Sequence, residues 1–96
     1  MPLSLDDALT IAPDVMFQHL NDEAVLLNLK SGTYFGLNEV GARAWQLILE
    51  HRRLRHVLDV LQNEYDAEPE AVERDLLALA EQLVNRQLVH VETDAR

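Results

Sequence analysis

The chain has 96 residues, of which 48% are hydrophobic, and a formal net charge of −9. This length accommodates one small domain with one hydrophobic core, and the apolar fraction argues against intrinsic disorder. The acidic balance disfavours a nucleic-acid binder, because such proteins neutralise phosphates with a basic surface. The lack of cysteine excludes a disulfide framework, a thiolate metal site and a cysteine nucleophile, and it is compatible with a reducing cytoplasm.

The N-terminal segment carries no regular hydrophobic period, and we predict a flexible lead-in over residues 1–12. This segment is acidic and interrupted by Pro2, so it lacks the basic start and long apolar run of a signal peptide. No apolar run in the chain approaches the length that spans a membrane. These features predict a cytoplasmic protein with no membrane partner.

Three strands of an antiparallel meander are predicted next, over residues 15–20, 24–29 and 33–37. A polar turn at residues 21–23 joins the first two strands. The second turn contains Gly32, which takes at little cost the positive φ that short hairpin loops require. Because helices follow the meander directly, its last strand is expected at an edge, where N–H and C=O groups are free for an extended peptide.

Three helices are predicted over residues 39–50, 55–65 and 69–86. Asn38 is suited to cap the first helix, because its side chain accepts a hydrogen bond from a free N–H of the first turn. Gly41 costs that helix about 1 kcal/mol relative to alanine, and a close approach of a strand would explain its presence. Pro69 suits the first position of the third helix, where no N–H is needed.

The third helix has the most regular apolar spacing in the chain. Its stripe, with the residues that widen it, comprises Val72, Leu76, Leu77, Leu79, Ala80, Leu83 and Val84. This face is broader than one packing contact requires, so part of it can remain open as a groove. Residues 88–91 are predicted to be extended and residues 92–96 to form a mobile tail. The predicted fold class is α+β, with a three-stranded antiparallel sheet followed by three helices.

No group of residues predicts catalysis, metal binding or cofactor binding. The four histidines form no ligand pair, since the nearest two, His51 and His56, are five residues apart and match a helix poorly. Ser4 and Ser31 lie in turn-like contexts, and the carboxylates decorate helix faces without a distinct acid–base pair. The glycines have the wrong spacing for phosphate loops and dinucleotide sites. We therefore expect a protein that is not an enzyme and uses no metal or cofactor.

The aromatic residues of the third strand and the basic residues near the first connection between helices each have two possible interpretations. Strand alternation places Phe35 on one face of the third strand and Tyr34 on the other. The aromatic residues are most simply core residues, whereas Tyr34 on the outer face is either an ordinary surface residue or a peptide contact. The basic residues near the first connection between helices form either a solvated loop or a patch for an anion or partner; they are Arg43, His51, Arg52, Arg53, Arg55 and His56.

The segment AVLLNLKSGTYFGLNEVGARAW, residues 24–45, resembles the PqqD family. The resemblance continues through Glu64-Tyr65-Asp66 and residues 70–83, which include Asp75-Leu76-Leu77, and it covers residues 13–91. It implies a small winged-helix-like domain that acts as a non-catalytic peptide chaperone, or recognition element, for ribosomally made peptides. The founding member presents a precursor peptide to a radical SAM enzyme in pyrroloquinoline quinone biosynthesis, and relatives serve lasso-peptide and other peptide-modifying systems. The resemblance therefore implies a partner enzyme that is a radical SAM enzyme or a leader peptidase or cyclase.

The resemblance also implies that a leader peptide adds as an antiparallel strand to the third strand and places side chains against the third helix. The residues implied in peptide binding are Thr33, Tyr34, Phe35, Gly36 and Leu37 on the strand, and Asp75, Leu76, Leu79, Gln82 and Leu83 on the helix. Which of Tyr34 and Phe35 faces the peptide stays open. Gln87 stands where the family often has a helix-ending glycine, which affects the predicted end of the helix and not the groove.

Two other functions are compatible with parts of this pattern. A structural interaction subunit of a larger complex would bind its partner while the strand edge stays free. A winged-helix nucleic-acid binder has fold analogy in its favour, together with the arginines of residues 52–55, but the charge of −9 argues against it. The predicted partners are a precursor leader peptide and a peptide-modifying enzyme, with no nucleic acid.

Overall fold

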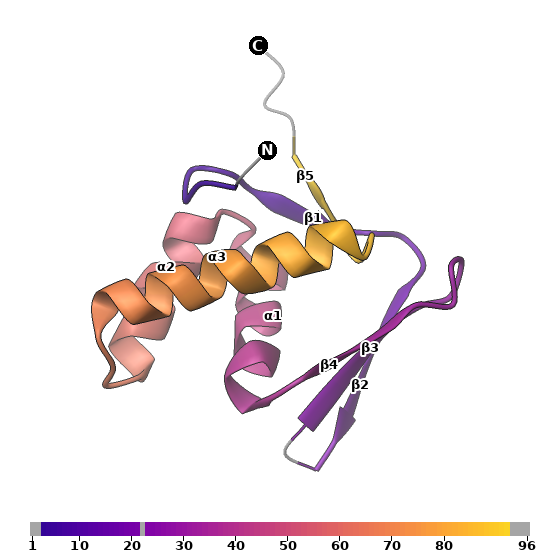
Figure 1. Cartoon of the computed structure of the whole chain (residues 1–96), viewed down its shortest axis with the longest axis horizontal. Helices are drawn as coiled ribbons and strands as arrows, with labels where there is room; N and C mark the ends of the chain where they lie inside the picture. Colours follow the sequence, from indigo (N-terminus) through magenta and orange to yellow (C-terminus); the bar gives the residue numbers. More distant parts are fainter. Residues whose placement is uncertain (1–2, 22, 93–96) are drawn as a thin grey trace.

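The computed structural model describes residues 3–21 and 23–92 and has an α+β fold (Figure 1). A three-stranded antiparallel sheet with strand order β2-β3-β4 is followed by three helices, which confirms the predicted fold class. A second, two-stranded sheet pairs the first and last strands of the chain. The elements in chain order are β1 (Leu9–Ile11), β2 (Val15–Leu20), β3 (Glu23–Asn28), β4 (Tyr34–Leu37), α1 (Glu39–His51), α2 (Leu54–Glu64), α3 (Pro69–Asn85) and β5 (Val89–Val91).

Among the described strands β4 pairs with β3 alone, so it lies at an edge of the sheet. The pairings run from Val15↔Asn28 to Leu20↔Glu23 between β2 and β3, and from Ala24↔Leu37 to Leu27↔Tyr34 between β3 and β4. The predicted second and third strands each extend one residue too far into their connecting turn. The N–H of Gly32 donates to the Asn28 carbonyl oxygen at 2.8 Å, and this bond closes the loop so that Leu29 and Thr33 lie outside the strands.

The β3–β4 turn is organised by Gly32 and by the side chain of Asn28. Gly32 has a φ of 77°, which confirms the predicted left-handed conformation. Asn28 is 6% exposed, and its Oδ1 accepts hydrogen bonds from the N–H groups of Lys30 (2.9 Å) and Ser31 (3.1 Å). The buried Asn28 side chain therefore provides the hydrogen-bond acceptor for these N–H groups of the turn, as asparagine commonly does for nearby backbone.

The junction between β4 and α1 confirms two predictions. Asn38 caps α1, because its Oδ1 accepts a hydrogen bond from the N–H of Gly41 at 2.8 Å. A Cβ atom on Gly41 would lie 3.2 Å from Leu37 Cδ2 and 3.3 Å from Asn38 Oδ1. The end of β4 thus approaches the helix closely, which accounts for a glycine inside it. α3 begins with Pro69 in its first turn, also as predicted.

The hydrophobic core lies where the three helices meet the inner face of β3 and β4. Its largest buried side chains include Trp45 and Ile48 from α1, Leu61 from α2, Leu83 from α3 and Leu26 from β3. In Figure 1, α3 returns across the molecule from the α2 side toward the strands. Val40, in the first turn of α1, is 45% exposed, whereas Ala44, Leu47 and Ile48 of the same helix are buried.

The structure differs from the predicted lead-in at residues 9–11, which form β1 and pair with β5 from Leu9↔Val91 to Ile11↔Val89 (Figure 1). Leu9 is completely buried, and its N–H donates to the Arg52 carbonyl oxygen at 2.9 Å. A three-residue strand is too short to show a hydrophobic period, so sequence patterning misses it. Of the predicted tail, residues 93–96 lie outside the described residues, as do residues 1–2, while the Glu92 N–H donates to the Ala8 carbonyl oxygen at 2.8 Å.

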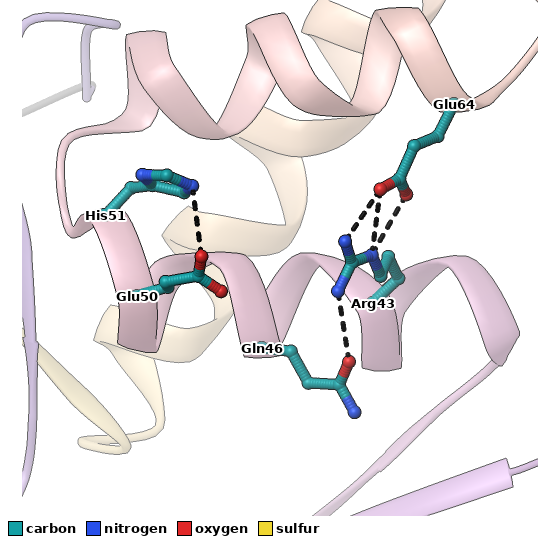
Figure 2. A network of polar contacts seen from close by, with 5 residues as sticks. All are labelled: Arg43, Gln46, Glu50, His51 and Glu64. Atoms are coloured by element: carbon teal, nitrogen blue, oxygen red, sulfur yellow. Dashed lines mark hydrogen bonds and ion pairs between the residues drawn. The ribbon is translucent and has the colours of Figure 1, made fainter.

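The arginines near the α1–α2 connection are bound to groups of this same chain. Arg55 Nη2 lies 2.8 Å from Asp6 Oδ1, and Arg53 donates to the carbonyl oxygen of Asp6. Figure 2 shows Arg43 of α1 reaching Glu64 of α2, with Nη2 and Oε2 separated by 2.6 Å. This hydrogen bond lowers the pKa of Glu64 and raises that of Arg43. Internal pairing of these guanidinium groups supports a structural role for them over a free anion patch.

Within residues 3–21 and 23–92, no helix combines the length and apolar character that crossing a membrane requires. Among the same residues, no three histidine, aspartate or glutamate side chains gather as metal ligands would.

Candidate functional site

An open pocket of about 520 Å³ lies between β4 and α3, with α1 and α2 closing its remaining sides. Its lining is mainly aliphatic and aromatic, with Asp75 as its one acidic side chain. The residues around it are Phe35, Gly36, Leu37, Asn38, Val40, Gly41, Ala44, Leu61, Tyr65, Ala67, Val72, Asp75, Leu76 and Leu79. We call this pocket the β4–α3 groove. An apolar concavity beside a sheet edge is a common form of binding site.

The strand residues implied by the family resemblance separate into two groups. Phe35, Gly36 and Leu37 line the β4–α3 groove. Thr33 and Tyr34 do not line it, and Tyr34 is 68% exposed because alternation turns its side chain to the other face of the sheet. The Phe35 side chain therefore faces the groove, while the Tyr34 side chain faces solvent.

The helix residues implied by the resemblance also separate. Asp75, Leu76 and Leu79 line the β4–α3 groove, whereas Gln82 and Leu83 do not. Leu83 is completely buried in the core, and Gln82 is exposed. The broad apolar face of α3 is thus shared, because Leu83 belongs to the core while Leu79 remains half-buried at the groove.

The free edge of β4 presents the backbone groups of Tyr34 and Gly36. The Asn28 N–H donates to the Thr33 carbonyl oxygen at 2.8 Å, so residue 33 directs its polar groups toward β3. Every second residue of a strand directs its N–H and C=O groups toward the same neighbouring strand. Phe35 and Leu37 therefore bond to β3 as Thr33 does. The N–H and C=O groups of Tyr34 and Gly36 then point away from the sheet, where an additional strand would pair with them.

Sequence reasoning missed the contributions of α1 and α2 to the groove. Val40 follows the Asn38 cap and stands 45% exposed at the rim, and Leu61 and Tyr65 approach from the end of α2. The sequence carries no local signal for these contributions, because only the packing of α2 against α1 brings Leu61 and Tyr65 close to Val40.

The end of α3 is fastened to the β3–β4 hairpin. Leu88 N–H donates to the Leu83 carbonyl oxygen at 2.9 Å and Gln87 N–H to that of Val84 at 3.0 Å, which together form a Schellman motif. Gln87 takes the left-handed conformation, with φ 62°, that glycine normally supplies. The Asn28 side-chain amide donates to the Gln87 carbonyl oxygen at 2.9 Å. Asn28 thereby links the two walls of the groove, and α3 ends where a glycine would end it.

The fold and the groove define a class of protein: a small α+β binding module that offers an open strand edge beside an apolar groove. The family model described as coenzyme PQQ synthesis protein D (PqqD) matches residues 23–89, which is more than half of the chain. The chain belongs to the PqqD family, as the resemblance implies. The match includes the β3–β4 hairpin, the groove and all three helices.

Two solved structures are similar to this chain over most of its length. One is TbiB1 in complex with the TbiA(beta) leader peptide, with 40% sequence identity, a TM-score of 0.79, and coverage of 88% of this chain and 99% of that chain. The other is lasso peptide synthetase B1 complexed with the leader peptide, with 28% identity, a TM-score of 0.77, and coverage of 86% and 98%. No curated protein matches the sequence.

Proposed function

We propose that this protein binds the leader segment of a ribosomally synthesised precursor peptide and presents it to the enzyme that modifies the peptide, without catalysing the reaction itself. The observation that carries the proposal is the open edge of β4 beside the β4–α3 groove. Membership of the PqqD family supports it, as does the similarity to two proteins solved with leader peptides.

In this proposal the leader adds to β4 as an antiparallel strand. Two N–H and two C=O groups, those of Tyr34 and Gly36, are available for pairing. Leader side chains on the inner face enter the groove between Phe35 and Leu79. Tyr34 then contributes its backbone, and Phe35 contributes its ring.

The remaining implied residues take different roles in the proposal. Leu37 and Leu76 are 4% and 3% exposed and form the floor on which a leader side chain rests. Asp75 stands at the rim with a highly exposed carboxylate. Leu83 supports the groove wall from the core, and Thr33 and Gln82 flank the groove.

The energetics favour a carrier of moderate affinity. Ordering a leader segment costs about 1–2 kcal/mol per residue, and each backbone hydrogen bond returns only about 1 kcal/mol net. Strand pairing by itself therefore gains little. Two or three leader side chains buried in the groove contribute about 1.5–3 kcal/mol each. Together these terms give a Kd on the order of micromolar to tens of nanomolar, which permits later release of the peptide.

The second partner in the proposal is the modifying enzyme. The similarity to a lasso peptide synthetase B1 supports a leader peptidase or cyclase in preference to a radical SAM enzyme. The precursor is made by ribosomes, so the proposal places the protein in the cytoplasm. The net charge of −9 and the internal pairing of the α1–α2 arginines both disfavour duplex DNA as an alternative ligand.

A titration of the isotope-labelled protein tests the proposal. The ligand is a synthetic leader of the precursor encoded beside the gene, and the measurement is the change in amide chemical shifts. Shifts at residues 33–37 and along α3 are expected, with Kd in the range given above. Absence of shifts from both regions would overturn the proposal. A partner protein that binds while β4 stays unperturbed would favour a structural interaction subunit instead.

A further inference from the structure

Arg86, directly after α3, is placed differently from the other arginines of the structure. Its Cζ lies 5.4 Å from the centroid of the Phe35 ring, which lines the β4–α3 groove. Within residues 3–21 and 23–92, each of the other arginines has a carboxylate or carbonyl partner: Arg43 with Glu64, Arg52 with Glu92, Arg53 and Arg55 with Asp6, and Arg74 with Asp75. Arg86 is exposed and has no such partner among the described residues.

The ring of Phe35 orients this cation. A guanidinium over an aromatic face is attracted by the ring and keeps its N–H edges available to a second group. Those edges fit the two oxygens of a carboxylate. The guanidinium therefore stands at the Phe35 end of the groove with its hydrogen-bonding capacity unused inside the described chain.

The register of an added strand determines which peptide residue meets Arg86. Tyr34 and Gly36 direct their polar groups outward, so an antiparallel peptide makes hydrogen-bonded pairs with them and a non-hydrogen-bonded pair with Phe35. Side chains of such a pair share a face of the sheet and lie closest together. The peptide residue opposite Phe35 thus faces the Phe35 ring and Arg86.

The same register places a second peptide residue over the apolar floor. The residue opposite Leu37 also points to the inner face, and it meets Leu37 and Leu76. In an antiparallel strand it comes two residues before the one opposite Phe35. The groove therefore distinguishes two positions of the peptide: an apolar one and, two residues later, one beside a cation.

We propose that Arg86 selects a peptide carrying aspartate or glutamate opposite Phe35, two residues after an apolar residue opposite Leu37. This inference rests on the proposed function and specifies the leader sequence that the same groove accepts. The chain carries a net charge of −9, so it repels a generally acidic peptide. The selected carboxylate is consequently confined to the single position beside Arg86.

A randomised twelve-residue peptide display library, selected on the full chain, tests this inference. Three proteins are compared: the wild type, Arg86→Glu and Arg86→Gln. Lys30→Gln is the control, because Lys30 is an exposed cation in the β3–β4 turn and does not line the groove. Thermal melts establish that each variant is folded, and amide shifts at β4 identify peptides that use its edge.

The wild type and Lys30→Gln are expected to enrich acidic residues two positions after an apolar residue. Arg86→Glu should enrich lysine or arginine at the same position, and Arg86→Gln should show no charge preference there. In a selected peptide, the change of that acid to its amide should weaken wild-type binding by about three- to fivefold and leave Arg86→Gln binding unchanged.

Two results would overturn the inference in distinguishable ways. If selected peptides perturb β4 but show the same charge preference in the wild type and Arg86→Glu, Arg86 does not read the peptide, while the proposed function stands. If no selected peptide perturbs β4 or α3, the proposed function fails and this inference fails with it.

Discussion

The β1–β5 side and the β4–α3 side of the molecule differ in whether their polar groups have partners within the chain. On one edge, β1 pairs with β5, Leu9 is fully buried, and Arg53 and Arg55 are bound to Asp6. On the other, the N–H and C=O groups of Tyr34 and Gly36 in β4 have no strand partner within residues 3–21 and 23–92, and they lie beside an apolar groove. Polar groups at the β1–β5 side are therefore paired within the chain, whereas the strand edge at the β4–α3 side remains available to a ligand.

This difference indicates that residues at one side determine the stability of the fold and residues at the other side determine peptide binding. An unpaired strand edge forms no ladder hydrogen bonds and an open groove leaves apolar surface in water, so the rest of the fold must be stable without them. The β1–β5 side supplies such a scaffold because its contacts lie far apart in sequence and close the domain. Substitutions at the two sides should therefore have separable effects, on unfolding at one side and on leader binding at the other.

The largest expected effect lies at the closed side. Leu9→Ala removes a completely buried side chain and should lower the free energy of unfolding by about 2–5 kcal/mol. Urea denaturation measures the loss. Leu29→Ala, the same change at a side chain 58% exposed in the hairpin turn, is the matched control and should change stability by less than about 0.5 kcal/mol. A large loss of leader affinity by folded Leu9→Ala would contradict the separation of the two sides.

The next effect lies at the open edge and concerns binding. Gly36→Pro removes one of the two outward N–H groups of β4 and places a ring where the leader backbone would lie. Leader affinity should fall about tenfold or more, while stability changes little because this N–H takes no part in the β3–β4 ladder. Isothermal titration calorimetry with the leader measures the difference.

Gly36→Ala is the control for that experiment. It keeps the N–H, and a Cβ atom at this position meets no atom within 4 Å. Near-wild-type affinity is therefore expected for the alanine variant. Equal affinities for the proline and alanine variants would show that the edge of β4 does not pair with the leader.

A smaller effect is expected at the end of α3, where the two sides meet. Gln87 has a φ of 62°, and replacing it by glycine removes the left-handed strain while keeping the carbonyl that accepts from Asn28. Gln87→Gly should raise the free energy of unfolding by about 0.5–1 kcal/mol. The same change at Asn85, the last residue of the helix, should instead lower it by a few tenths of a kcal/mol. Urea denaturation of both variants gives the comparison.

The smallest effect concerns the Arg43–Glu64 ion pair between α1 and α2, which Figure 2 shows. The hydrogen bond from Arg43 lowers the pKa of Glu64 below its ordinary value of 4.5, so the folded state favours the charged carboxylate. Its stabilising contribution is present above pH 4.5 and is lost as the pH falls through the lowered pKa. The difference in Tm between wild type and Glu64→Gln should therefore be present at pH 7 and disappear in strong acid. A difference that persists unchanged in acid would contradict this.

The sequence by itself determined the features that depend on neighbouring residues. Gly32 predicts a left-handed turn, Asn38 a helix cap and Pro69 a helix start, and each prediction is confirmed. Apolar periodicity predicts the three strands and three helices, with an error of at most one residue at each end. These features are readable because local backbone preferences and nearby hydrogen bonds decide them.

Only the tertiary structure decided which residues meet across the chain. β1 pairs with β5 from the opposite end, and Asn28 reaches Gln87, although neither partner carries a local signal of the other. Packing also divides the apolar face of α3, so Leu83 enters the core while Leu79 stays at the groove. The physical reason is the same in each case: long-range contacts depend on how the elements pack together, and one strand's or helix's periodicity does not contain that information.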